Sequence, residues 1–105
     1  KVKGSSNIVS GDHNAMSGDS NAVSGSNNSL IGSKNTVEGS GNSVLGNTNK
    51  LSGSQNAVNG ENNKVVGNGN IVLGGTNQVD AVNAYIDGEF NNISDFFNFD
   101  WSDLF

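Results

Sequence analysis

The sequence predicts an all-β fold, a parallel β-solenoid built from a seven-residue repeat. Glycine recurs every seven residues from Gly4 to Gly74, and asparagine follows three residues after each of these glycines. Two residues after each asparagine comes an aliphatic residue or methionine, so the unit is G-x-x-N-x-Φ-x, repeated eleven times. A fixed short period that runs through most of a chain is typical of a repeat architecture in which each unit packs only on its neighbours.

The residue types of the repeat favour strands over a coiled coil. A heptad coiled coil needs two apolar seams and helix-forming residues, whereas here every seventh residue is glycine and asparagine and serine are abundant, which disfavours helix. In a strand, residues two apart point to the same face. The asparagine and the apolar residue therefore point inward together, and Gly-x-x forms the corner, because glycine supplies the backbone freedom of a tight turn.

Each heptad is then one short strand and one corner, and two heptads complete one coil. Coils stacked as parallel strands would bury the apolar rows of two sheets in a thin core. The inward asparagines would form ladders near the corners, where each carboxamide bonds the next coil and the turn backbone. The expected ladder residues are Asn7, Asn14, Asn21, Asn28, Asn35, Asn42, Asn49, Asn56, Asn63, Asn70 and Asn77.

The repeat continues beyond the last regular heptad. Gly88, Asn91 and Ile93 form a further match, after a heptad in which Ala81 replaces the glycine and Ala84 replaces the asparagine. The sequence therefore predicts one repeat domain that extends to Ser94.

Residues 1–94 form this repeat domain, and residues 95–105 form a separate acidic and aromatic segment. Aromatic side chains could close the open end of the core while acidic residues discourage strand pairing, which predicts a C-terminal cap. The segment could instead be a docking segment with aromatic anchors. The residues expected to cap or dock are Phe96, Phe97, Phe99, Trp101, Leu104 and Phe105. The closing Ser-Asp-Leu-Phe also resembles the C-terminal signals of type I secretion substrates, which implies export.

Composition and charge argue against several classes of function. Residues 1–80 hold all five lysines and five acidic residues, and residues 81–105 hold the other five acidic residues with no base. A neutral body without arginine is a poor nucleic-acid binder, and no apolar run is long enough to insert into a membrane. There is no cysteine and a single histidine, His13, so no zinc site, other cofactor or catalytic triad is expected. The chain is predicted not to be an enzyme.

Two short motifs resemble a known family. Asn28-Ser29-Leu30-Ile31-Gly32 and Asn42-Ser43-Val44-Leu45-Gly46 look like shortened versions of the motif in the head domains of YadA-like trimeric autotransporter adhesins. The resemblance covers residues 1–94. It implies a left-handed parallel β-roll with two heptads per coil, in which outward apolar residues pack three rolls together.

Alternate heptads predict two different outward faces. One face is mixed and charged, with residues such as Glu38, Lys50 and Lys64, and we expect it to be solvated. The other carries no charge before Asp87, and a flat, partly apolar face indicates an interaction surface. The residues expected to mediate self-association on this face are Ile31, Leu45, Ile71, Leu73 and Tyr85.

The favoured hypothesis is an extracellular structural protein that associates with itself, as a homo-oligomer or an end-to-end filament, and forms or decorates a fibre, surface layer or adhesin. A host or surface ligand would be an additional partner. The alternative is a monomeric ligand- or ice-binding solenoid, since a regular flat face suits ice. Uniform threonine or alanine rows are typical of such faces, however, and Thr36 is expected on the opposite, charged face.

Overall fold

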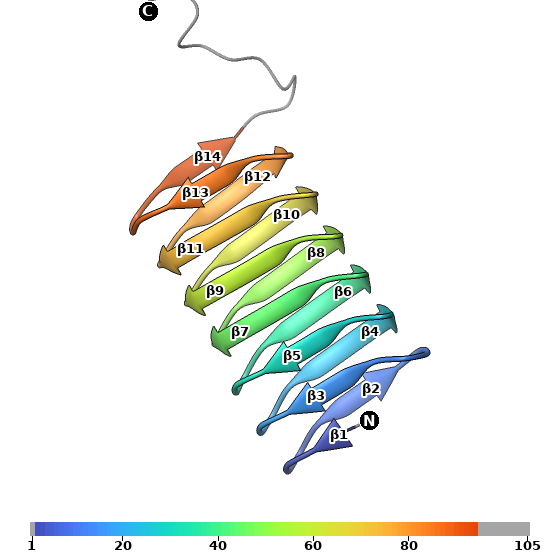
Figure 1. The fold of residues 1–105 in the computed structure, drawn as a ribbon. Helices are drawn as coiled ribbons and strands as arrows, with labels where there is room; N and C mark the ends of the chain where they lie inside the picture. The colour runs from blue at the N-terminus through green and yellow to red at the C-terminus, as the bar shows by residue number, and fades with distance from the viewer. Residues whose placement is uncertain (1, 95–105) are drawn as a thin grey trace, which may run out of the picture.

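The computed structural model describes residues 2–94, and it is a parallel β-solenoid of two facing sheets (Figure 1). The chain alternates between the sheets, so that the odd-numbered strands form sheet A and the even-numbered strands form sheet B. Neighbouring strands pair in parallel with partners fourteen residues apart, as in Val44↔Val58 and Val65↔Val79. The predicted fold class and the two heptads per coil are therefore confirmed.

Most strands have three or five residues, and the longer ones lie in the middle of the stack. Sheet A consists of β1 (Val2–Lys3), β3 (Ala15–Ser17), β5 (Ser29–Ile31), β7 (Ser43–Asn47), β9 (Ala57–Glu61), β11 (Ile71–Gly75) and β13 (Tyr85–Asp87). Sheet B consists of β2 (Ile8–Ser10), β4 (Ala22–Ser26), β6 (Thr36–Ser40), β8 (Lys50–Ser54), β10 (Lys64–Asn68), β12 (Gln78–Val82) and β14 (Asn92–Ser94).

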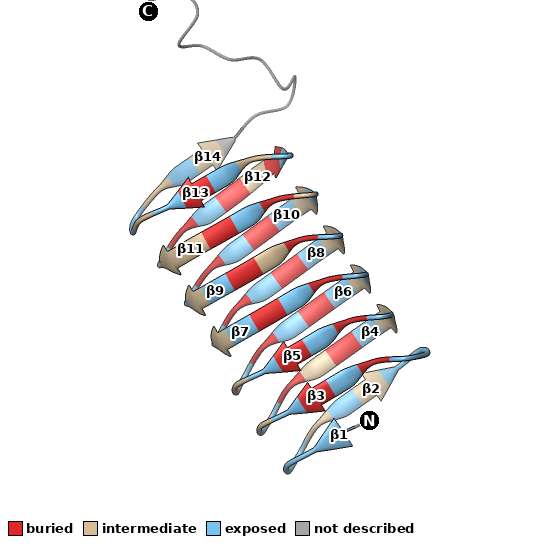
Figure 2. Ribbon diagram, in the orientation of Figure 1, coloured by how far each residue is buried: buried red, intermediate tan, exposed pale blue. Residues whose placement is uncertain are grey.

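The core is a single layer of apolar side chains between the two sheets. From β2 to β14, each strand contributes its second residue, which gives the buried band along the stack in Figure 2. Leu30, Val37 and Leu51 are at most 1% exposed, and burying one such side chain stabilises a fold by roughly 1.5–3 kcal/mol. Because the layer is only one side chain deep on each sheet, this stability depends on stacking many coils.

The corners differ from the expectation that Gly-x-x alone makes the turn. In the central coils the strand begins after the asparagine and runs through the glycine to the following residue, as in Ala22–Ser26. The turn is made by the third residue of each heptad, which adopts a left-handed backbone conformation; Lys34, for example, has φ of 62°. Its N–H donates to Asp19 O of the previous coil at 3.0 Å, so the corners themselves are bonded from coil to coil.

The glycines are required because successive coils approach very closely at each corner. Gly46 has φ of 135°, a conformation that residues with a side chain rarely adopt. A Cβ built on Gly46 would lie 1.9 Å from Gly60 O of the next coil. The seven-residue spacing of glycine therefore reflects contact between coils as well as the geometry of the turn.

The inward asparagines form two ladders, one along each edge of the stack. Asn49 shows the pattern: its Nδ2 donates to Asn35 Oδ1 of the previous coil at 3.2 Å and to Gly60 O of the next coil at 2.8 Å. Its backbone N–H also donates to Asn35 Oδ1, at 3.0 Å. Ten of the predicted ladder residues, from Asn14 to Asn77, are at most 4% exposed, and Asn7 in the first corner is partly buried.

The irregular heptad near the end of the repeat keeps the coil but interrupts one ladder. Ala81 occupies the glycine position without positive φ and is buried, and its carbonyl accepts the Asn70 Nδ2 hydrogen bond at 2.8 Å. The Ala84 N–H donates to Asn70 Oδ1 at 2.9 Å. Because alanine has no side-chain carboxamide, this ladder is not continued to the following coil. The other ladder continues to Asn91.

The expected cap or docking segment, residues 95–105, lies outside the described residues, so its role and the domain boundary at residue 94 stay predictions. No helix within residues 2–94 is long and apolar enough to cross a membrane.

Candidate ligand-binding face

The two sheets present outward faces of different chemistry. The first and third residues of β3, β5, β7, β9 and β11 point outward and define the sheet A face, which is uncharged; Glu61, the last residue of β9, lies at the corner. The outward residues of this face are Ala15, Ser17, Ser29, Ile31, Ser43, Leu45, Ala57, Asn59, Ile71 and Leu73. The corresponding outward residues of β2 to β12 define the sheet B face: Ile8, Ser10, Ala22, Ser24, Thr36, Glu38, Lys50, Ser52, Lys64, Val66, Gln78 and Asp80.

The structure places the five residues predicted for self-association on sheet A. Ile31, Leu45, Ile71 and Leu73 belong to the sheet A face, and Tyr85 follows them on β13. Ile31 and Leu45 are about half exposed, at 54% and 48%, although both are large aliphatic side chains. Sheet A therefore offers solvent an apolar surface that its own chain leaves uncovered within the described residues.

The side chains of the sheet A face lie in two straight rows because the strands pair in unbroken register. Ser29 pairs with Ser43 and Ser43 with Ala57 in one row, while Ile31 pairs with Leu45 in the other. Strand spacing sets a repeat of roughly 4.7–4.9 Å along each row. The rows are two residues apart along the strand, which is roughly 6.6 Å.

Shallow troughs lie between the two rows, above the buried side chains of the strands. One trough, of about 180 Å³, extends across β7, β9 and β11 and is lined by Ser43, Leu45, Ala57, Val58, Asn59, Ile71 and Leu73. A second extends across β3 and β5 and reaches Lys3 at the N-terminal end. The sheet A face is thus grooved along the stack.

Charges bound the sheet A face at both ends and do not enter it. Lys3 on β1 and Asp87 on β13 occupy the row that contains Ile31 and Leu45. Between these two residues the face presents only hydroxyl, amide and apolar groups over five strands. The sheet B face, in contrast, places Lys50 beside Lys64 in one row, with Glu38 and Asp80 in the other.

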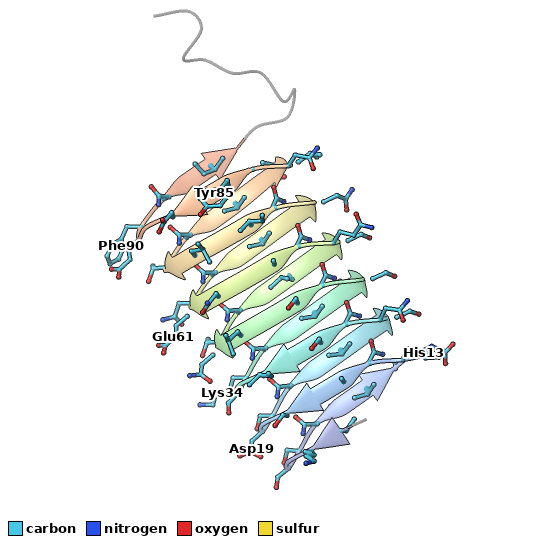
Figure 3. All side chains as sticks on the ribbon, in the orientation of Figure 1. His13, Asp19, Lys34, Glu61, Tyr85 and Phe90 are labelled. Atoms are coloured by element: carbon cyan, nitrogen blue, oxygen red, sulfur yellow. The ribbon has the colours of Figure 1, made fainter. Side chains whose placement is uncertain are left out.

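The corner positions hold most of the remaining charge. In Figure 3, Asp19, Lys34 and Glu61 project from one edge of the stack, and His13 projects from the opposite edge. Asp19 has a structural role there, because its Oδ1 accepts the Ser5 N–H at 2.8 Å. Within residues 2–94, no three His, Asp or Glu side chains gather to form a metal site.

Comparison with known protein families identifies the fold. Residues 1–95 match the model of the grass antifreeze β-roll, an ice-binding family. No curated protein matches the chain.

This match corrects two expectations. The resemblance to the adhesin head domains is wrong, and with it the role as a structural protein of a fibre, surface layer or adhesin. The resemblance rested on two short motifs, Asn28–Gly32 and Asn42–Gly46, whereas the family match extends over residues 1–95. Association of the chain with itself stays a prediction.

The prediction that the chain is not an enzyme agrees with the family. The match extends over the whole of the repeat, from the first residue to the last coil. The chain belongs to the grass antifreeze β-roll family.

Proposed function

We propose that this protein binds ice and that the sheet A face is its ice-binding surface. The family match supports ice as the ligand. The observation that favours sheet A is the pair of uncharged, in-register rows over β3 to β11, which the sheet B face lacks.

A ligand that is an extended solid requires a flat, rigid and periodic surface. Parallel pairing repeats the same groups at every strand, at roughly 4.7–4.9 Å, which is close to the repeat of water molecules in the ice lattice. The two ladders and the corner hydrogen bonds fix each coil to the next, as at Asn35 and Asn49. The positions of the outward groups are therefore set before ice is met, and little conformational entropy is lost on binding.

The chemistry of the rows suits ordered water. The hydroxyls of Ser17, Ser29 and Ser43 can each donate and accept hydrogen bonds, so each can join a network of ordered water as a donor or as an acceptor. The neighbouring apolar groups, such as Ile31 and Leu45, leave adjacent water free to bond to other water. Waters held in the trough between the rows would bridge the protein to the lattice.

Charged side chains are unsuited to the same task, because an ion orients its hydration shell around itself. The sheet B face has four charged residues, Glu38, Lys50, Lys64 and Asp80, distributed over both rows. This arrangement keeps the reverse side of the molecule in liquid water while the sheet A face meets ice.

We also propose that the protein acts outside the cell. Ice in a freezing tissue or medium grows first in the extracellular water, where a binding protein meets it. Membership of an antifreeze family supports this location.

A matched pair of alanines provides the test. Ala57 on sheet A and Ala22 on sheet B occupy the same position of the heptad, directly after a ladder asparagine, and both are partly buried. Thermal hysteresis and inhibition of ice recrystallisation are measured for the 105-residue chain and for Ala57→Lys and Ala22→Lys. We expect Ala57→Lys to lose most of the activity and Ala22→Lys to keep it.

The opposite ranking would assign ice binding to sheet B. A wild-type chain without activity in either assay would overturn the proposed function. Circular dichroism of both variants verifies that each keeps the β-solenoid, so that lost activity is not lost structure.

A further inference from the structure

Not every asparagine of the chain belongs to a ladder. The asparagines that lie outside the ladders and are exposed within the described residues are Asn27, Asn47, Asn59, Asn62, Asn68, Asn83 and Asn92. Two of them stand in an N-x-Ser sequence: Asn27-Asn28-Ser29 and Asn92-Ile93-Ser94. N-x-Ser or N-x-Thr without proline at x is the acceptor sequence for N-linked glycan in secreted proteins.

We propose that Asn27 and Asn92 are N-glycosylation sites of this protein. The donor is a lipid-linked diphospho-oligosaccharide. The Asn Nδ2 forms a bond to C1 of the first sugar and loses one proton, while the bond from C1 to the diphosphate oxygen breaks and the lipid diphosphate leaves. The proposal rests on the extracellular location proposed above and does not depend on ice binding.

The repeat itself keeps the ladder asparagines out of this reaction. Two residues after every ladder asparagine lies the inward apolar residue, as in Asn42 and Val44, so no ladder asparagine has the required serine or threonine. A glycan on a ladder Nδ2 could not be accommodated, because the Asn42 Nδ2 donates both to Asn28 Oδ1 and to Gly53 O in the interior. Only residues outside the ladders can accept a glycan without loss of the fold.

Asn27 lies at the apex of a corner, where a glycan has space. It is the third residue of its heptad, with φ of 60°, and it is exposed. Its backbone N–H donates to Asp12 O at 3.0 Å, so the backbone is fixed by the corner and not by the side chain. The equivalent residue of the next coil is Gly41, which has no side chain to obstruct a sugar.

Asn92 lies on sheet B, opposite the proposed ice-binding surface. It is the first residue of β14, it is exposed, and it pairs with Gln78 of β12, whose side chain points outward in the same row. A glycan here would stand on the side of the molecule that faces liquid water. The one outward asparagine of the sheet A face, Asn59, is followed by Gly60 and Glu61 and is therefore no acceptor.

Glycopeptide mapping of the protein isolated from its natural source tests the assignment. We expect peptides that contain Asn27 and Asn92 to carry N-acetylglucosamine-linked glycan. Treatment with peptide N-glycosidase should convert both residues to aspartate. An unmodified residue at either position would overturn the assignment of that site, and two unmodified residues would overturn the proposal.

Glutamine variants of the chain, secreted from a glycosylating eukaryotic host, give an independent measurement. Glutamine already occupies both kinds of position, at Gln55 with φ of 58° and at Gln78 on the neighbouring strand, so Asn27→Gln and Asn92→Gln should fold normally. Each variant should lose one glycan and the double variant both. A glycan that persists in the double variant would contradict the assignment.

Ice binding and glycosylation are tested by separate measurements, so failure of one proposal can be distinguished from failure of the other. Ice binding is measured on the glycan-free chain made in bacteria, and that result does not depend on Asn27 or Asn92. Because Asn92 lies opposite the sheet A face, Asn92→Gln should also leave the ice activity of the secreted protein unchanged within twofold.

Discussion

The carboxamide of Asn42 is stacked on that of Asn28, one coil away. Asn28 Oδ1 accepts hydrogen bonds from the Asn42 backbone N–H at 3.0 Å and from Asn42 Nδ2 at 3.1 Å. The second Nδ2 proton of Asn42 is directed to Gly53 O at 2.9 Å. One buried side chain thus forms hydrogen bonds to the coil before it and to the coil after it. The stability of the stack and the flatness of its outward faces therefore have the same origin.

Replacement of this side chain by alanine should destabilise the whole stack. Asn42→Ala leaves Asn28 Oδ1 and Gly53 O without the Nδ2 partner, and the Asn56 N–H without its acceptor. Buried polar groups left unpaired cost about 1–3 kcal/mol each, so we expect the free energy of unfolding to fall by about 3 kcal/mol or more. Urea denaturation followed by circular dichroism measures the change. The exposed control Asn62→Ala, in a corner, should change it by much less, and equal losses would contradict the role of the ladder.

A methyl group at a corner glycine should be poorly tolerated. Gly46→Ala brings a Cβ against Gly60 O and forces a residue with a side chain to adopt φ of 135°. Both effects are unfavourable, and we expect a loss of about 3 kcal/mol or more, or failure to fold. Gly75→Ala is the control, since Gly75 lacks positive φ and a Cβ added there would lie 3.3 Å from Glu61 O. Thermal unfolding of both variants gives the comparison, and a Gly46→Ala protein as stable as Gly75→Ala would refute the explanation.

The third heptad position offers a stabilising change. Thr48 and Thr76 adopt φ of 58° and 55°, where β-branched residues are strained. Asparagine adopts this conformation more readily and already does so at Asn62. Thr48→Asn and Thr76→Asn should each raise the free energy of unfolding by about 1 kcal/mol. The reverse change, Asn62→Thr, should lower it by a similar amount; an increase there would show that strain at this position is not the cause.

Removal of the charges that bound the sheet A face should enlarge the proposed ice-binding surface. Lys3→Ser and Asp87→Ser together extend the uncharged row by one strand at each end. Because a larger flat contact binds the lattice more strongly, we expect thermal hysteresis to increase. Lys50→Ser, which removes a charge from sheet B, is the control and should leave hysteresis unchanged. An increase in the control alone would show that net charge, and not the extent of sheet A, determines activity.

The sequence predicts strand, sheet and face well because these depend on residue spacing. The two-residue separation of Asn28 and Leu30 places both inward, and the alternation of heptads assigns Ile31 and Leu45 to one sheet, as observed. The left-handed corner residue could not be found in the same way. Ser, His, Lys, Thr and Phe all occur at that position, because hydrogen bonds between corners, such as Lys34 N–H to Asp19 O, impose the conformation on whatever residue is present.

The role as a structural protein of a fibre, surface layer or adhesin was predicted wrongly. An uncharged face that contains Ile31 and Leu45 suits a protein partner and an ice lattice equally well in physical terms, since both exclude liquid water from apolar groups. Thr36 lies on sheet B, while the sheet A face mixes serine, alanine, asparagine and aliphatic residues and has no uniform threonine row.

Competition for a growing ice crystal within a single sample tests the ice-binding face most directly. Ala57→Lys and Ala22→Lys, labelled with two different dyes and mixed in equal amounts, are exposed together to an ice crystal grown slowly from solution. If sheet A binds ice, Ala22→Lys will be concentrated in the ice while Ala57→Lys stays in the liquid. Equal incorporation of the two variants, or enrichment of Ala57→Lys, would contradict the assignment of ice binding to sheet A.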